Sequence, residues 1–551
     1  MNDVLTDLKS LRETLSFDKR LEKSHSPNDE NATEILQATT GDANKSTAET
    51  NYSFARQINS RKPLAALALI VLFAAMGFGF WHFNIFSANT TQIESIAVLP
   101  FENQNPDTEY LSDGLTESII NSLSGLANLR VISRNSVFRY KGKETDSGTV
   151  GRELNVSAVL TGRFIQRGDD LMVSAELTDV RDNKQIWGRQ YNRQAADAYA
   201  LQQEISRDIS ETLRTKLTGE QQQQLAKRET DSPEAFQLYL KGRYHWNKRT
   251  NDGSLKAIEF YNQAIEKDPT FAPAYVGLAN CYLSVTFKYS ITMKERVAMV
   301  KAAANKALEI DPKLGEIHAT LAINYHFNEW DWANAEREYK LAVELSPNYA
   351  TAHHWYAEFL ATEGRFDESF AEYQQALALD PLSLAISTDL GLNYYYARQY
   401  DRAIEHLKKL KEVDPNYTRT HFFLAQVYEE SEMFEESIAE NDRAYVISGI
   451  NLQKLEERKT ILEETFKTSG AKGFWQKMLE IAPAGGGKQS PVIEAIFHAR
   501  LDEQNKAFEF LEKAYNERNP LMVWLKVSPE FDNLRPDPRF ADIMRRVGLP
   551  Q

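Results

Sequence analysis

The stretch "SPNYATAHHWYAEFLATEGRFDESFAEYQQALALDP", residues 346–381, begins and ends with a proline that follows Ser or Asp. Five such motifs, EKDP, EIDP, ELSP, ALDP and EVDP, place prolines at 269, 312, 347, 381 and 415. The intervals are 43, 35, 34 and 34 residues, and Gly449 follows after another 34. Proline ends a helix, because it lacks a backbone donor and restricts the residue before it. A period of 34 therefore predicts a ladder of helix–turn–helix units.

Small and large residues recur at fixed positions within these units. Counting back from each proline or from Gly449, one column holds Ala264, Ala307, Ala342, Ala376 and Ala444, with Leu410 as the departure. Counting forward, a second column holds Ala279, Ala322, Ala357, Gly391 and Ala425, and Tyr261, Tyr339 and Tyr373 form a large-residue column. Small residues against large ones let neighbouring helices interlock, so each unit buries its apolar face by stacking on the next.

The period of 34 is typical of tetratricopeptide (TPR) repeats. It predicts six repeats over 235–449, with an insertion near 285–293 that accounts for the 43-residue interval. Residues 450–551 are predicted to form degenerate repeats and a terminal cap, which a solenoid needs to stay soluble. The Gly-rich stretch 484–490, "AGGGKQS", lacks the spacing of a phosphate-binding loop and is interpreted as a linker.

Residues 93–217 follow a different, mixed pattern. Strands are predicted at 93–101 and 129–138, and helices at 110–126, 150–157 and from Ala196 to about Leu217. Three further strands are expected to join at Gly168-Asp169 and Asp182-Asn183. The sequence therefore predicts a small α/β domain ahead of the repeats.

Four blocks in this region carry a family resemblance. "IAVLPFENQNPDTEYLSDGLTESIINSLS", "LRVISRNSVFRYKG", "GRELNVSAVLTGRF" and "LTDVRDNKQIWGRQYNR" occur in this order and closely resemble the TolB-type amino-terminal-like domain. In bacterial membrane proteins that domain commonly lies between an anchor and TPR repeats. Its relatives often have a kinase, cyclase or winged-helix domain ahead of the membrane span, and the 60 polar residues at the start of this chain are too few for one. The expected fold is multidomain: one transmembrane helix, a small α/β domain and an all-α TPR solenoid.

The predicted membrane segment is 63–83, which contains no charged side chain. Its length suits a helix that crosses ~30 Å of hydrocarbon, and we favour a retained anchor over a cleaved signal peptide. Basic residues precede it at Lys45, Arg56, Arg61 and Lys62, and none follows until Arg130. The positive-inside rule then predicts a single-pass protein of the bacterial inner membrane, with a cytoplasmic N-terminus and an extracytoplasmic C-terminal part.

Residues 1–60 are otherwise polar and are expected to be disordered. Within them, leucines spaced every three or four residues before residue 22 suit either a short amphipathic docking helix or a marginal helix without a partner.

Composition and motifs argue against several chemical functions. The net charge of -14 disfavours nucleic acid as a partner. The single cysteine, Cys281, is expected to be buried. His353 and His354 are adjacent on a predicted helix, so their rings diverge by about 100° and cannot share a metal ion. Asp113 and Glu117 are interpreted as acids near a helix N-terminus and not as a cation site. The sequence therefore predicts no enzyme, no metal and no cofactor.

The predicted site is the inner groove of the solenoid, where such repeats bind a peptide or partner helix. Its candidate residues, taken from the repeat register, are Asn280, Asn324, His354, Glu358, Tyr395, Arg419, Phe422 and Gln426. An idle polar surface is the alternative for these positions. The predicted function is a membrane-anchored scaffold that binds a protein or peptide on the extracytoplasmic side. The second hypothesis is a signal transducer that couples an outside ligand to a cytoplasmic partner through residues 1–23.

Overall fold

The computed structural model of the chain describes residues 93–126, 128–213, 219, 228–284, 292–481 and 490–549. The short helix predicted before residue 22, the disorder predicted over 1–60 and the predicted membrane segment 63–83 all concern residues outside these ranges. Across the described part, no helix is both long enough and apolar enough to cross a membrane.

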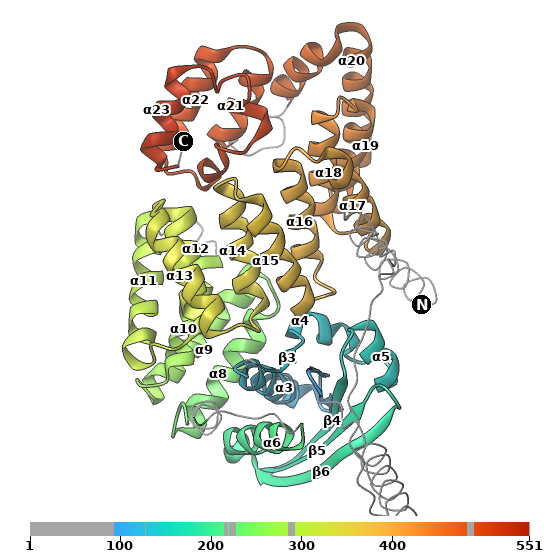
Figure 1. Cartoon of the computed structure of the whole chain (residues 1–551), viewed down its shortest axis with the longest axis vertical. Coiled ribbons are helices and arrows are strands. Elements are labelled where there is room, and N and C mark those ends of the chain that lie inside the picture. Colours follow the sequence, from blue (N-terminus) through green and yellow to red (C-terminus); the bar gives the residue numbers. More distant parts are fainter. Residues whose placement is uncertain are drawn as a thin grey trace, which may run out of the picture. The chain divides into compact units, whose positions relative to one another are not determined.

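The first part of the described chain contains a six-stranded mixed sheet (Figure 1). Its strands are β1 (Ser95–Val98), β2 (Glu102–Asn103), β3 (Arg130–Val131), β4 (Ala158–Arg167), β5 (Asp170–Asp179) and β6 (Lys184–Gln194). The order is β3-β1-β4-β5-β6, with β2 paired to β4. Strand β1 pairs in parallel with β3 and β4, and β2 pairs in parallel with β4, while β4, β5 and β6 form two antiparallel hairpins. The two predicted hairpin turns are confirmed: Gly168 and Asn183 both have positive φ.

The helices of this α/β module are α3 (Glu109–Ser124), α4 (Arg134–Val137), α5 (Ser147–Glu153) and α6 (Ala198–Thr212), with short 3₁₀ turns at Pro106–Thr108, Phe138–Tyr140 and Ala195–Asp197. The strand predicted at 129–138 is wrong beyond Val131, because the chain leaves the sheet there. Ser133 donates its backbone N–H to the carbonyl of Leu379 in the repeat region, and α4 begins at the next residue. A long-range contact thus overrides the β-branched character of this stretch.

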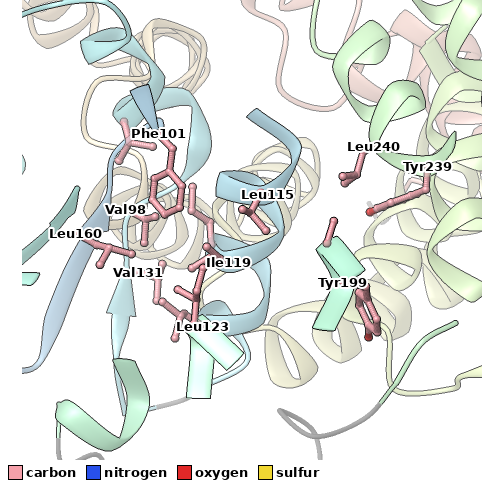
Figure 2. Close-up of a cluster of buried hydrophobic side chains, with 14 of the residues drawn as sticks. Val98, Phe101, Leu115, Ile119, Leu123, Val131, Leu160, Tyr199, Tyr239 and Leu240 are labelled. Atoms are coloured by element: carbon pink, nitrogen blue, oxygen red, sulfur yellow. The ribbon is translucent and has the colours of Figure 1, made fainter. Parts of the chain in front are cut away.

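Helix α3 is the central packing element of the module (Figure 2). Leu115, Ile119 and Leu123 are almost fully buried, and Figure 2 places them beside Val131 and Leu160. A single hydrophobic cluster continues from the sheet through α3 and α6 into the first helices of the solenoid. The core of the α/β module is therefore continuous with the core of the first repeats.

The repeat region consists of six helix pairs. They are α8 (Pro233–Trp246) with α9 (Asn251–Lys267), α10 (Ala272–Ser284) with α11 (Met293–Ile310), α12 (Gly315–Ile323) with α13 (Trp332–Leu345), α14 (Ala350–Thr362) with α15 (Phe366–Leu379), α16 (Leu384–Tyr396) with α17 (Tyr400–Val413), and α18 (Thr418–Glu430) with α19 (Phe434–Ile447). From α9 to α17 the second helix of each pair ends two residues before the motif proline. The predicted helix–turn–helix ladder is confirmed.

The small-residue and tyrosine columns lie where the sequence placed them, at the helix contacts. Ala264, Ala279, Ala322 and their equivalents are nearly or fully buried, as is Tyr261. A Cβ added at Gly277 would lie 2.4 Å from the ring of Tyr261, so the tyrosine fills the space that the missing side chain leaves. The small-residue and tyrosine columns therefore mark the positions where ridges of one helix pack into grooves of the next.

One repeat has 35 residues because of a π-helix. Helix α12 continues into η4 (Asn324–Glu329), whose π-helical geometry accommodates one additional residue in a turn. Trp330 then adopts a left-handed conformation with φ 52°, and α13 begins two residues later. The interval between Pro312 and Pro347 is thus one residue longer without disturbing the stacking of the pairs.

The C-terminal region contains α20 (Leu452–Ile481), α21 (Pro491–Arg500), α22 (Gln504–Asn516), the 3₁₀ turns η6 (Pro520–Trp524) and η7 (Pro529–Phe531), and α23 (Pro538–Val547). Gly470 interrupts α20 with non-helical φ/ψ. The chain then returns to the middle repeats: Trp332 donates its indole N–H to the carbonyl of Val547 at 2.8 Å, and the ring of Trp524 stacks on Tyr396 at 4.5 Å. This region therefore packs against the repeats as well as following them.

Candidate binding groove

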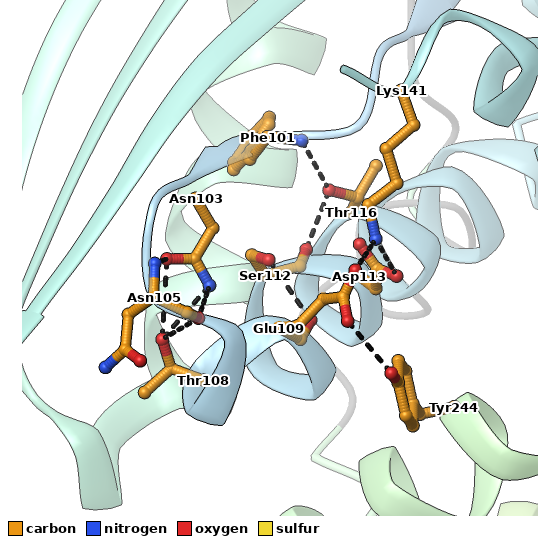
Figure 3. Close-up of polar contacts among 10 residues, drawn as sticks. All are labelled: Phe101, Asn103, Asn105, Thr108, Glu109, Ser112, Asp113, Thr116, Lys141 and Tyr244. Carbon is orange, nitrogen blue, oxygen red and sulfur yellow. Dashed lines mark hydrogen bonds and ion pairs between the residues drawn. The ribbon is translucent and has the colours of Figure 1, made fainter.

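The two acids singled out near the start of α3 take part in ion pairs within the protein. Lys141 bonds to both Glu109 and Asp113 at 2.6 Å, as Figure 3 shows. Glu117 is buried and pairs with Arg243 of α8 and with Arg134. The pair between Glu117 and Arg243 joins α3 to the first repeat, and the pair between Asp113 and Lys141 lies within the module, so both acids have a structural role.

The same connection is organised by hydrogen bonds around the start of α3. In Figure 3 the hydroxyl of Thr116 accepts the backbone N–H of Phe101 at 3.1 Å and donates to the carbonyl of Ser112 at 2.8 Å. Glu109 also accepts a hydrogen bond from the hydroxyl of Tyr244 in α8 at 2.9 Å. The polar residues of this region therefore hold the module on the repeats.

Three of the predicted groove residues are buried in the structure. Asn280 accepts a hydrogen bond from Thr320 of the next repeat at 2.5 Å. Asn324 lies in η4, where its amide donates to Glu329 at 2.9 Å. Tyr395 is fully buried. These side chains support the repeats from within.

Three others converge on an acid that the sequence analysis did not select. His354 and Glu358 lie one turn apart on α14, Asp389 lies on α16, and Arg419 lies on α18. The His354 Nε2 atom lies 3.0 Å from Asp389 Oδ2, and Arg419 donates to Asp389 Oδ1 at 2.5 Å. The side chain of Asp389 is only 4% exposed, whereas that of Arg419 is 47% exposed. We refer to these four residues as the groove cluster.

Asp389 was missed because it lies one position past the repeat register. The position equivalent to His354 is Thr388, whose hydroxyl is buried and bonds to Thr420. Reading only the equivalent offsets therefore passes over the neighbouring carboxylate. An acid at 389 beside an arginine at 419, one repeat apart on successive first helices, is the signal that could have found it.

The surroundings in the groove cluster shift the pKa values of Glu358 and His354. Burial raises the pKa of Glu358 to about 7, and the nearby charge of Asp389 acts in the same direction, while His354 and Arg419 oppose it. Burial lowers the pKa of His354, but its hydrogen bond to Asp389 and the charge of Glu358 outweigh this, so the pKa is raised overall. The surroundings in this cluster thus raise the pKa of both His354 and Glu358.

The last two predicted residues lie toward the C-terminal region. Gln426 of α18 donates to Glu530 of η7 at 2.7 Å, so a segment of the chain itself covers this position. Phe422, on the same helix, lies edge-on to Tyr445 with ring centroids 5.6 Å apart and is partly exposed. The inner helices are thus covered by the chain at α18 beside η7, and they are more open near Arg419 and Phe422.

Two family models match the chain. A model of the tetratricopeptide repeat matches residues 321–383 and 388–449. The chain contains tetratricopeptide repeats. A second model, of the HilA/YgeH-like transcriptional regulator second domain, matches residues 91–208. The resemblance of the α/β module to the TolB-type domain stays a prediction.

Several known proteins are similar to parts of this chain. A Rhizobium meliloti protein named "Putative adenylate cyclase 3" is 33% identical over 232 residues, which cover 42% of this chain and 40% of that protein. The transcriptional regulator HilA of Salmonella typhimurium is 24% identical over 308 residues, 55% of this chain and 54% of HilA. The solved structure of Pseudomonas aeruginosa PilF aligns with a TM-score of 0.28 and 18% identity, over 49% of this chain and 98% of PilF.

The first of these relatives corrects one expectation. The prediction that the chain is not an enzyme is contradicted by its similarity to a protein named for a cyclase activity. That expectation rested on the absence of catalytic motifs from the sequence, which does not exclude an activity shared with a relative. The chain spans about half the length of the curated relatives that it matches.

Proposed function

We propose that this TPR protein binds a protein or peptide partner on the inner face of α14, α16 and α18, and that residues 63–83 tether it to the bacterial inner membrane. The partner would be met on the extracytoplasmic side. The observation that supports the binding site is the groove cluster, in which charged side chains from three successive repeats converge on one point.

The physical reason is that burying charged side chains costs free energy, and a role in binding would account for their presence here. Burying Asp389 and most of His354 removes them from water, and the ion pair with Arg419 only partly compensates for that loss. Arg419 remains about half exposed, so it can bond to a carboxylate or a backbone carbonyl of a partner. Phe422, three residues further along α18, adds an apolar contact beside it.

The binding test is a crosslinking capture with the full chain in native membranes. Arg419→Glu places a second negative charge beside Asp389 and is expected to reduce recovery of the captured partner at least tenfold. Arg443→Glu is the matched control, because Arg443 lies on the second helix of the same repeat and bonds only to Asn416 and the Pro415 carbonyl among the described residues. Equal recovery of the partner by both variants would show that the inner face is not the binding site.

The tether has a separate test. Deletion of residues 63–83 is expected to release the chain from membranes washed at alkaline pH, whereas the unchanged chain stays in the pellet. If the chain without residues 63–83 stays in the membrane pellet, these residues are not the tether.

A role in signalling is the second candidate, supported by the relatives' names. This chain shares segments with a protein named for adenylate cyclase and with a transcriptional regulator. A segment that occurs both in a protein named for a cyclase and in a transcriptional regulator suits a binding or regulatory role. Deleting residues 1–23 while keeping 63–83 tests this signalling role. Partner capture should remain, and the cellular response to the partner should be lost. An unchanged response would exclude transmission through residues 1–23.

A further inference from the structure

The groove cluster contains three potential metal ligands. One ligand atom from each of His354, Glu358 and Asp389 can be chosen so that all three lie within 4.8 Å of one another. Two of these residues are spaced i and i+4 on α14, which places them on one face of the helix, and the third comes from α16. The arrangement thus combines one imidazole with two carboxylates on two rigid helices.

The hydrogen bonding of the cluster suits an ion at its centre. The short contact between His354 Nε2 and Asp389 Oδ2 is 3.0 Å, close to the spacing of about 3.4 Å between neighbouring ligands of a tetrahedral zinc ion. A cation could therefore take the place of the hydrogen bond between these two atoms. Arg419 bonds to the other oxygen, Oδ1, and so orients the carboxylate as outer partners of metal ligands do.

Among the three potential metal ligands, Glu358 has the fewest hydrogen-bond partners. Among the described residues no hydrogen bond to its carboxylate is found, and its interactions with His354, Asp389 and Arg419 are purely electrostatic. Since the three ligand atoms already lie within 4.8 Å of one another, a shift of at most about 1.4 Å would bring the Glu358 oxygen to ligand spacing. The carboxylate is thus free to complete a third ligand position.

Other histidines of the repeats show what a structural pair looks like. His318, His353 and His421 each contact one glutamate at 2.6 Å through Nδ1, and their Nε2 atoms face the carbonyls of Pro312, Pro347 and Pro415. In those pairs both ring nitrogens face a protein acceptor and no second carboxylate is added. His354 differs because, besides the carboxylate that its Nε2 faces, a second acid, Glu358, lies one turn along its own helix.

We propose that His354, Glu358 and Asp389 bind a divalent transition-metal ion of the zinc class, with a fourth position open to water or to a partner side chain. An imidazole ligand with two carboxylates favours zinc, cobalt or nickel over calcium and magnesium, which prefer oxygen ligands alone. The metal site shares the groove cluster with the proposed function, but it requires no partner.

The test is a calorimetric titration of the full, tag-free chain in detergent with Zn²⁺, repeated with Co²⁺ to follow its visible absorption. One ion per chain is expected, with Co²⁺ absorption typical of tetrahedral coordination. His354→Ala and Asp389→Asn are expected to weaken binding at least tenfold. Glu358→Gln should weaken it as well and should not perturb folding, because its carboxylate has no hydrogen bond to lose.

His498→Ala is the matched control, because His498 also contacts a carboxylate at 2.6 Å, that of Glu503, outside the cluster. Its affinity should equal that of the unchanged chain. No binding by the unchanged chain, or equal binding by the Glu358→Gln variant and the control, would overturn the proposal. Partner capture by Arg419→Glu is measured separately, so loss of the metal site and loss of the proposed function can be told apart.

Discussion

The imidazole of His421 in α18 lies 2.6 Å from the carboxylate of Glu440 in α19, and its other nitrogen lies 3.0 Å from the carbonyl of Pro415. One buried ring thus connects both helices of a repeat to the turn before them. Each ring nitrogen faces an oxygen of the protein, so the ring is held from both sides. The same arrangement recurs at His318 and His353.

Removing this connection should loosen one repeat. His421→Ala leaves the mostly buried Glu440 with Lys411 as its remaining charged partner and is expected to cost about 1–3 kcal/mol. Hydrogen exchange of the backbone amides of α18 and α19 should quicken relative to that of α14 and α15. Arg443→Ala, on the exposed face of α19, is the control and should leave exchange unchanged. Equal protection in His421→Ala would show that the connection contributes nothing to stability.

His326 should make the middle repeats sensitive to acid. Burial lowers its pKa from 6.5 to about 3, so the folded state holds the neutral ring, whereas the unfolded chain takes up a proton below 6.5. This contribution to stability is fully present above pH 6.5 and is lost as the pH falls toward 3, by about 1.4 kcal/mol per pH unit.

The measurement is thermal unfolding from pH 7 to 5. Other groups contribute to the slope, so the difference between the unchanged chain and His326→Gln isolates this residue. Stability of the variant should fall less steeply with acid, and parallel curves would exclude the histidine as the cause.

Tyr261 should be sensitive to a methyl group added opposite it. In Gly277→Ala the new Cβ would lie 2.4 Å from the ring, so the first and second repeats must shift. Although Ala favours helices over Gly by up to about 1 kcal/mol, overpacking of this kind costs about 1–3 kcal/mol. We expect a net loss of stability in urea unfolding.

The matched control for that change is the double variant Tyr261→Leu with Gly277→Ala. The smaller side chain makes room for the methyl group, so the alanine should cost less in this background than in the unchanged one. An additive result would mean that the two residues do not compete for space.

The contact between α4 and the α15–α16 turn should depend on one serine. Ser136 donates to the buried carboxylate of Asp380 at 2.5 Å and accepts the backbone N–H of Leu382 at 3.0 Å. Ser136→Ala leaves both groups short of a partner and is expected to cost about 1–3 kcal/mol. Proteolysis near residue 382 should accelerate, with Ser147→Ala on the neighbouring helix α5 as the control. Unchanged cleavage would show that the contact is dispensable.

Repeat number, helix pairing and the small and large columns could all be predicted from the sequence, because they depend on local spacing. Ala279 and Ala322 share one column and Tyr261 belongs to another, and each is buried where its column predicted. The hairpins at Gly168 and Asn183 were predictable for a similar reason, since two residues decide each turn.

The groove cluster was only partly predictable. His354, Glu358 and Arg419 were selected from the register, but Asp389, which joins them, lies outside it. Gln426 was selected as an open groove residue, yet it bonds to Glu530, 104 positions away. The π-helix at 324–329 was likewise visible only as an interval of 35 residues.

The amino-acid sequence by itself determined the repeating helical hairpins, because the burial of one apolar face per unit depends on residues that are neighbours along the chain. Only the tertiary structure decided which charged groups meet. That depends on how far each hairpin rotates against the next and on where the chain returns after α20, and neither quantity is encoded in local periodicity.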